Sequence, residues 1–94
     1  MPIRYQRNSA AETAPLDRGV VVLEPKSRKF CALNQTSNLI WSSLEWPTSA
    51  EQLAELLAER FEGVTPSEAL RDVQAIIEEM ISVGIVLPLD SEAI

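Results

Sequence analysis

The sequence has few residues that could carry covalent chemistry. It contains one cysteine, Cys31, and no histidine. A thiol nucleophile needs a base or a nearby positive charge to form its thiolate, and histidine most often supplies that base. Cys31 stands in an apolar segment, where a small buried strand residue is the simpler interpretation. The 14 carboxylates include no pair that the sequence places in one cleft. We therefore predict that the chain is not an enzyme.

Metal and cofactor sites have equally little support. Zinc and haem lose their usual ligands when histidine is absent and only one thiol is present. No loop of Asp, Asn and Gly has the spacing of a calcium site, so we predict no cofactor and no metal. A single cysteine cannot form an internal disulfide. No apolar run approaches the roughly 20 residues of a membrane span, and the N-terminus does not resemble a signal peptide. We expect a cytoplasmic protein without a membrane partner.

Charge is distributed unevenly along the chain. Residues 1–34 carry six cations and three anions, whereas residues 35–94 carry two cations and eleven anions. The simpler explanation is that exposed helices carry many glutamates; the functional one is that the basic first third attracts an acidic partner. A winged-helix DNA-binding regulator is the alternative function. It is disfavoured because the last helix offers Arg71 against several anions, and phosphate contacts dominate DNA affinity. We therefore expect no nucleic-acid partner.

The 94 residues predict one domain, 1–94, with strands before helices. Alternation and β-branched residues indicate strands, and the period of apolar residues then changes to that of helices. The turn-rich residues 8–18 predict a mobile loop. In chain order we predict three strands, three helices and an extended tail that packs back on the core: 2–7, 19–24, 29–33, 35–45, 49–61, 66–83 and 85–89. The fold class is α+β, a three-stranded antiparallel sheet followed by a three-helix bundle.

Several residues mark where the helices begin and end. Asn34 is a plausible N-cap of the first helix. Thr48–Glu51 and Thr65–Glu68 both have the form of a capping box, a hydroxyl followed three residues later by glutamate. Gly84 is the expected left-handed residue after the last helix.

Two surfaces carry more apolar residues than a core requires. The last helix has an apolar arc of about 160°, where a core-facing helix needs about 100°. The excess border is formed by Ala69, Ile76 and Val83. Strands 19–24 and 29–33 are apolar on both faces, although a sheet open to water on one side would alternate. Both excesses could be ordinary core packing. Alternatively, if the sheet order is 1-2-3, strand 29–33 is an edge, and an extended peptide could pair with it beside the last helix.

The order and spacing of these segments resemble the PqqD-like family of RiPP recognition elements. The segments are Val-Val-Val-Leu-Glu at 20–24, Phe-Cys-Ala-Leu-Asn at 30–34, Ile40-Trp41, Asp72-Val73 and Gly84-Ile85-Val86. Such proteins bind the leader peptides of ribosomally made, post-translationally modified peptides. The Leu-Asn-x-Thr and Ile-Trp segments look most like the free-standing leader-binding protein of lasso-peptide biosynthesis. The family pattern has a glycine in the turn between the second and third strands or after Thr36, where this chain has Ser27-Arg28 and Ser37.

The resemblance implies a winged-helix-like fold and a non-catalytic role. A leader peptide would add a strand to 29–33 beside the last helix and be delivered to a separate cysteine protease; a cyclase is a further partner left open. Three turn cations could steer acidic leader residues. The peptide-binding residues predicted on this basis are Val22, Lys29, Phe30, Cys31, Ala32, Leu33, Ala69, Asp72, Val73, Ile76 and Met80.

Overall fold

The computed structural model describes residues 3–89 of the chain, which form six strands and three helices. In chain order these are β1 (Arg4–Arg7), β2 (Glu12–Leu16), β3 (Gly19–Glu24), β4 (Lys29–Leu33), α1 (Gln35–Ser43), β5 (Thr48–Ser49), α2 (Ala50–Arg60), α3 (Pro66–Val83) and β6 (Val86–Leu89). The predicted α+β class, with one three-stranded antiparallel sheet and three helices, is confirmed, and a second small sheet is present as well.

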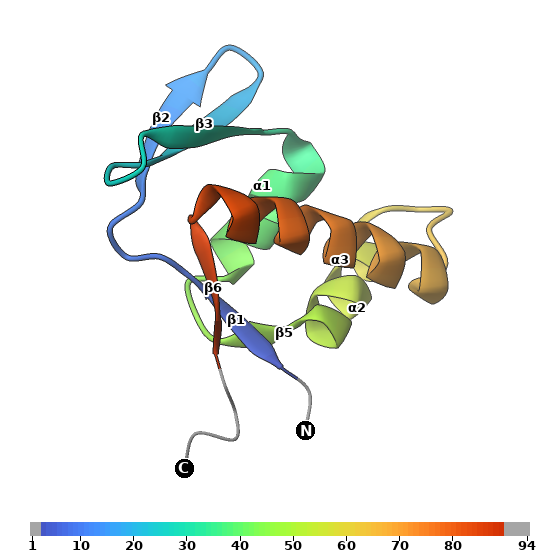
Figure 1. Cartoon of the computed structure of the whole chain (residues 1–94). Helices are drawn as coiled ribbons and strands as arrows, with labels where there is room; N and C mark the ends of the chain where they lie inside the picture. Colours follow the sequence, from blue (N-terminus) through green and yellow to red (C-terminus); the bar gives the residue numbers. More distant parts are fainter. Residues whose placement is uncertain (1–2, 90–94) are drawn as a thin grey trace.

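The strands form two separate three-stranded antiparallel sheets. The first, which we call the hairpin sheet, has the order β2-β3-β4. The second, the terminal sheet, has the order β5-β1-β6 and joins the two ends of the described chain. Figure 1 shows the hairpin sheet at one end of the molecule and the terminal sheet at the other, with the helices between them.

Two predictions about the first eighteen residues were wrong. The segment predicted as a mobile loop contains β2, which pairs with β3 along its whole length. The first strand does not belong to this sheet, because β1 pairs with β5 and β6 instead. All five residues of β2 are exposed. Because no residue of β2 enters the core, its sequence needs no alternation of apolar and polar residues and shows none. Pairing with β3, rather than burial, defines the strand.

The helix ends largely follow the sequence signals. Asn34 caps α1 by accepting a hydrogen bond from the backbone N–H of Ser37 at 2.9 Å. Thr65 caps α3 by accepting from the N–H of Glu68 at 3.2 Å. Gly84 ends α3 in the left-handed conformation with φ of 91°. The predictions for the first and last helices are confirmed to within two residues.

The cap of α2 lies one residue later than predicted. Ser49, not Thr48, accepts from the N–H of Gln52, and Gln52 in turn accepts from the N–H of Ser49. Thr48 pairs with Tyr5 in the terminal sheet. The error arises because both hydroxyls precede a residue that can complete a capping box, and the strand pairing decides between them.

One core lies between the hairpin sheet and the helices. The inner face of the hairpin sheet contributes Val22, Cys31 and Leu33. The helices, their ends and the start of the tail contribute the other buried apolar residues: Ile40, Trp41, Leu44, Ala50, Leu53, Ala54, Leu57, Ala69, Val73, Ile77, Met80, Ile85 and Val86. Ile85 and Val86 have no exposed surface, so the tail packs back on the core as predicted.

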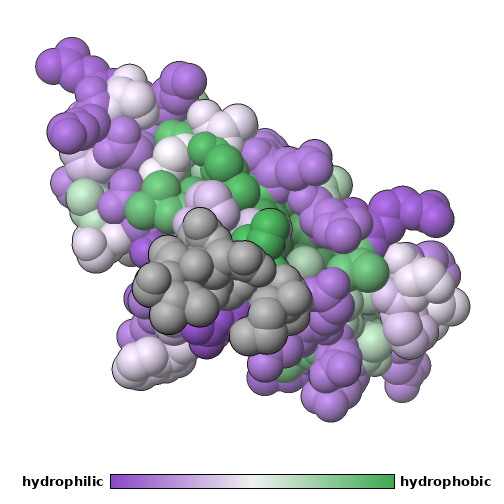
Figure 2. All heavy atoms as spheres, turned by 60° about the horizontal axis from the view of Figure 1, so that its bottom comes forward, coloured by the Kyte–Doolittle hydropathy of each residue, from purple (hydrophilic) through white to green (hydrophobic). Residues whose placement is uncertain are grey.

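Exposed apolar side chains occur on both sheets. Leu87 of β6 is 49% exposed, and Ile3, which directly precedes β1, is 53% exposed. Figure 2 brings this end of the molecule forward and shows apolar residues in the middle of the face, bordered by hydrophilic ones. None of the helices in the described part of the chain is long and apolar enough to span a membrane.

Candidate functional site

The four edge strands of the two sheets differ in whether they can accept another strand. Proline has no backbone N–H and so weakens an edge as a pairing template. β2 contains Pro15 and β6 contains Pro88, and β5 has only two residues. β4 has five residues and no proline. Among the described residues, β4 is therefore the edge on which an incoming strand meets no such obstacle.

The open side of β4 carries little that would compete with a guest strand. Within residues 3–89, the backbone hydrogen bonds that lie outside helices and ladders involve no residue of β4. At its first residue, the N–H of Lys29 donates to Ser27 Oγ at 3.3 Å. The Cys31 thiol makes a long contact of 4.0 Å with the Ala32 carbonyl. No second backbone segment among the described residues pairs with this side, as the predicted edge position requires.

The two faces of β4 have different surroundings. Cys31 and Leu33 are buried and face the core, whereas Phe30 is 66% exposed and Ala32 is exposed. The register explains this division, because Cys31 is paired with the buried Val22 and Ala32 with the half-buried Val21. A guest strand would continue this alternation.

Helix α3 presents a stripe of mixed character beside β4. Asp72, Ile76, Glu79 and Val83 follow the spacing of one helical face. Ile76 and Val83 are half-buried, and the two acids are exposed. Burial raises the pKa of the Cys31 thiol, and the charge of Glu79 raises it further. Residues of α3 and β4 are in contact, so the stripe lies beside β4. We call β4 and this stripe together the β4–α3 surface.

The structure separates the predicted site residues into two groups. Lys29, Phe30, Ala32 and Asp72 are exposed, and Ile76 is half-buried. The other six are buried in the core: Val22, Cys31, Leu33, Ala69, Val73 and Met80. These six buried residues lie beneath the β4–α3 surface and support it. Contact between a peptide and any of the eleven residues stays a prediction.

Glu79 and Val83 complete the stripe but are absent from the predicted site. Val83 belongs to the apolar border predicted from the sequence, and Glu79 lies next to it on the same helical face. Their spacing in the sequence could have identified both residues as part of the site, since positions 72, 76, 79 and 83 are separated by four, three and four residues.

The turn between β3 and β4 is built around a buried carboxylate. Glu24 is 8% exposed and accepts hydrogen bonds from the backbone N–H groups of Lys26 and Ser27, both at 2.9 Å. Both bonds favour the ionised carboxylate and lower the pKa of Glu24 below its usual value, and the bond from Lys26 contributes most. Arg28 has φ of 62°, the left-handed region that favours glycine. This chain thus places arginine where the family pattern leads one to expect glycine.

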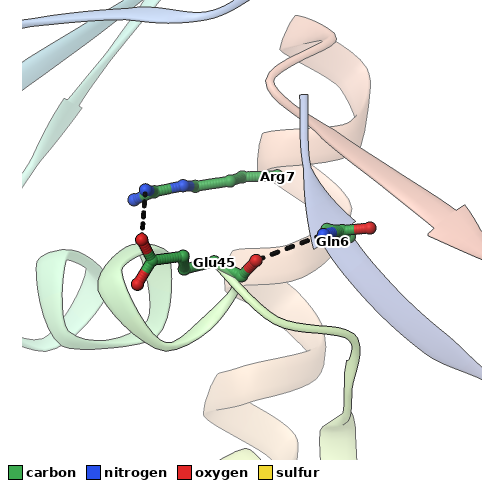
Figure 3. A network of polar contacts seen from close by, with 3 residues as sticks. All are labelled: Gln6, Arg7 and Glu45. Atoms are coloured by element: carbon green, nitrogen blue, oxygen red, sulfur yellow. Dashed lines mark hydrogen bonds and ion pairs between the residues drawn. The ribbon is translucent and has the colours of Figure 1, made fainter. Parts of the chain in front are cut away.

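A separate polar hollow of about 380 Å³ lies between β1 and α1, away from β4. Its lining includes Arg7, whose guanidinium lies 3.7 Å from Glu45 Oε1 and 5.3 Å from the ring centre of Trp41. Gln6 donates to the backbone carbonyl of Glu45 at 3.1 Å, as Figure 3 shows. The charge of Arg7 is therefore already matched within the chain, and these contacts tie β1 to the end of α1. Over the described residues, no cluster of three or more possible ligands could hold a metal ion.

Comparison with known proteins identifies the family. The family model for Coenzyme PQQ synthesis protein D (PqqD) matches residues 19–86, more than half of the chain. The chain belongs to the PqqD family. The resemblance noted in the sequence is thereby confirmed.

Two solved structures share the PqqD-family fold described here. A lasso peptide synthetase B1 complexed with the leader peptide has a TM-score of 0.76 and 28% sequence identity, covering 89% of this chain and 98% of that one. TbiB1 in complex with the TbiA(beta) leader peptide has a TM-score of 0.74 and 20% identity, covering 86% and 93%. A comparison with curated protein sequences finds no match.

Proposed function

We propose that this PqqD-family chain binds the leader segment of a ribosomally made precursor, of the lasso-peptide class, and delivers it to a separate cysteine protease. The chain itself is a non-catalytic recognition module. The leader adds a strand to β4 and lies against the α3 stripe. The observation that carries this proposal is the edge of β4, which has five residues and neither proline nor an internal partner among the described residues.

Backbone pairing supplies affinity and the α3 stripe supplies selectivity in this arrangement. Ile76 and Val83 offer apolar contact, while Asp72 and Glu79 favour polar or basic leader residues at the rim. Both solved relatives carry a leader peptide, which supports the same class of ligand here. The exposed acids of α3 oppose the alternative, a DNA-binding winged helix, because they repel phosphate.

The binding site can be tested with a matched pair of variants. The probe is a fluorescein-labelled synthetic leader of the precursor encoded in the same gene cluster. Ile76→Asp introduces a charge into the α3 stripe and should weaken binding by at least about tenfold. Ile81→Asp is the control, because Ile81 is also a half-buried isoleucine of α3 but lines a hollow beside Tyr5 and Ala50. Equal loss in both variants at equal stability would refute the site.

The binding mode requires a second measurement. Leader peptides methylated at single backbone nitrogens cannot donate a hydrogen bond at that position. Strand addition predicts that affinity falls at every second position within the bound segment, because alternate N–H groups face β4. A uniform response along the peptide would contradict β-augmentation while leaving leader binding itself intact.

A further inference from the structure

Helix α3 carries a second surface on the side that faces away from β4. At 100° per residue, Leu70, Gln74 and Ile81 lie about 160° around the helix from the stripe that contains Asp72 and Ile76. The two surfaces therefore share no residue and lie on nearly opposite sides of α3.

Two neighbouring hollows follow this second side of α3. The first, of about 200 Å³, is lined by Glu51, Ala54, Glu55, Pro66 and Leu70. The second, of about 270 Å³, is lined by Tyr5, Ala50, Gln74, Ile77, Glu78 and Ile81. The hollows adjoin, because Leu70 and Gln74 are one turn apart on α3 and Ala50 and Ala54 are one turn apart on α2. We call these lining residues together the α2–α3 groove.

The groove has the form of a seat for a helix. Helices α2 and α3 pack side by side, as Figure 1 shows, and the lining follows α3 from Pro66 to Ile81. At 1.5 Å per residue this span is about 22 Å, the length of a helix of about 15 residues. The second hollow is bounded by Tyr5 of β1, the middle strand of the terminal sheet, so it offers side chains and no open backbone edge. Helix-in-groove packing therefore fits this surface, and strand addition does not.

Carboxylates border the groove on both helices. Glu51, Glu55 and Glu78 are exposed, and none of them forms an ion pair within the described residues. Even with the neighbouring Arg71 counted, the border has an excess of negative charge. Lysine or arginine on the flanks of an incoming helix would be attracted to this border.

A second copy of the chain does not supply such a helix. Residues 35–94, which include all three helices, carry two cations against eleven anions, so that the groove repels them. The exposed cations of the first third lie on β1 and at the turns of the hairpin sheet, and none is on a helix: Arg4, Arg18, Lys26, Arg28 and Lys29. Charge complementarity therefore favours a different protein.

We propose that the α2–α3 groove docks a helix of a partner enzyme, apolar along one side and flanked by lysine or arginine. The enzyme is then held on the opposite side of α3 from the leader, so that both bind at once. The simultaneous presence of a leader rests on the proposed function, whereas the groove is formed by the chain alone.

The chemistry of the groove can be tested with two synthetic peptides. The probe is a labelled peptide of about 15 residues with leucines along one helical face and lysines on both flanks. The comparison peptide has glutamate in place of each lysine. Fluorescence anisotropy at about 0.15 M salt, where long-range attraction is screened, should give at least about tenfold weaker binding of the glutamate peptide. Equal binding of the two peptides would overturn the charge complementarity.

A matched pair of double variants tests the border. Glu51→Gln with Glu55→Gln removes two carboxylates from the groove, and Glu12→Gln with Asp17→Asn removes two exposed carboxylates from the hairpin sheet and its turn. The groove variant should bind the lysine peptide about three- to tenfold more weakly. The control should stay within about twofold, and leader affinity should stay within about twofold in both. Equal loss of peptide affinity in the two variants would show attraction to overall charge and overturn the proposal.

A second pair tests the apolar centre. Leu70→Ser removes an apolar contact from the groove and should weaken peptide binding by about tenfold or more. Leu56→Ser is the control, because Leu56 is also half-buried on a helix but lines neither hollow. Urea denaturation shows whether both variants remain folded. An affinity of Leu70→Ser equal to that of the wild type would overturn the proposal.

Enzyme recruitment is measured with the purified enzymes encoded in the same gene cluster. Calorimetric titration into the Glu51/Glu55 variant should show at least one enzyme bound about threefold or more weakly than by the wild type, with and without saturating leader. Unchanged affinity for every enzyme would overturn the proposal. Absence of leader binding in the wild type would refute the proposed function alone, since the titrations without leader still test the groove. Self-association of the wild type that the same variant abolishes in sedimentation experiments would assign the groove to a second copy and overturn the proposal.

Discussion

Gly84 lies directly against the side chain of Glu24, so that the end of α3 is packed on the β3–β4 turn. A Cβ atom built at Gly84 would lie 3.3 Å from Glu24 Cγ, and Gly84 has φ of 91°. Glu24 cannot easily move aside, because its carboxylate accepts from two backbone N–H groups of the turn. This contact links α3 to the turn from which β4 begins, and therefore helps to set the spacing of the β4–α3 surface.

Gly84→Ala should lower the free energy of unfolding by about 1–2 kcal/mol, because alanine is strained at positive φ and its methyl group meets Glu24. Gly63→Ala is the control: Gly63 has φ of 80°, but a Cβ there would meet nothing within 4 Å. Urea denaturation of both variants separates backbone strain from the packing contact. Equal losses would show that the Glu24 side chain yields without cost.

Stability should decrease in acid partly through Glu24. Hydrogen bonds from Lys26 and Ser27 lower the pKa of this carboxyl in the folded protein. A lowered folded pKa stabilises the fold above the unfolded pKa, and this contribution is lost as pH falls through the folded pKa. Denaturation midpoints from neutral pH to about pH 3 should therefore fall less steeply in Glu24→Gln than in the wild type. Parallel curves would contradict the role of this carboxylate.

Arg28→Gly should raise the free energy of unfolding by up to about 1 kcal/mol, because it removes a side chain from the left-handed region. The gain is reduced by the greater freedom of glycine in the unfolded chain. Arg28→Ala retains a Cβ and should give no such gain. Thermal melts of the two variants make the comparison, and greater stability of the alanine variant would show that the turn carries no strain at this position.

Cys31 should react slowly with iodoacetamide at neutral pH, because burial and then the charge of Glu79 raise its pKa and reduce the thiolate. The rate should increase with pH, and Glu79→Gln should shift this increase to lower pH. Leader binding should persist in Cys31→Ala, since the thiol faces the core and has no catalytic role in the proposal. Rapid labelling of the wild type at neutral pH would contradict the burial of this residue.

Much of the candidate site could be predicted from local sequence. The hairpin of β3 and β4, the caps Asn34 and Thr65, and the end of α3 at Gly84 follow from side chains and backbone preferences within a few positions. The edge position of β4 was predicted correctly. The neighbour predicted on the other side of β3 was β1, whereas the structure has β2 there.

The sequence could not separate the site residues that face outward from those that face the core. Val21 and Val22, or Cys31 and Ala32, are equally plausible in either place when both faces of the hairpin are apolar. The same ambiguity affects α3, where Val73 and Ile76 share one apolar arc but differ in burial.

The amino-acid sequence by itself determined the family, the β3–β4 hairpin that precedes the helices, the helix boundaries to within two residues and the absence of histidine. These depend on residue types and short-range spacing. Only the tertiary structure decided that residues 12–16 form a strand, that β1 joins β6, and which face of the hairpin is covered. The reason is physical: Arg4 and Leu89 pair from opposite ends of the described chain, and no local preference encodes a contact of that range.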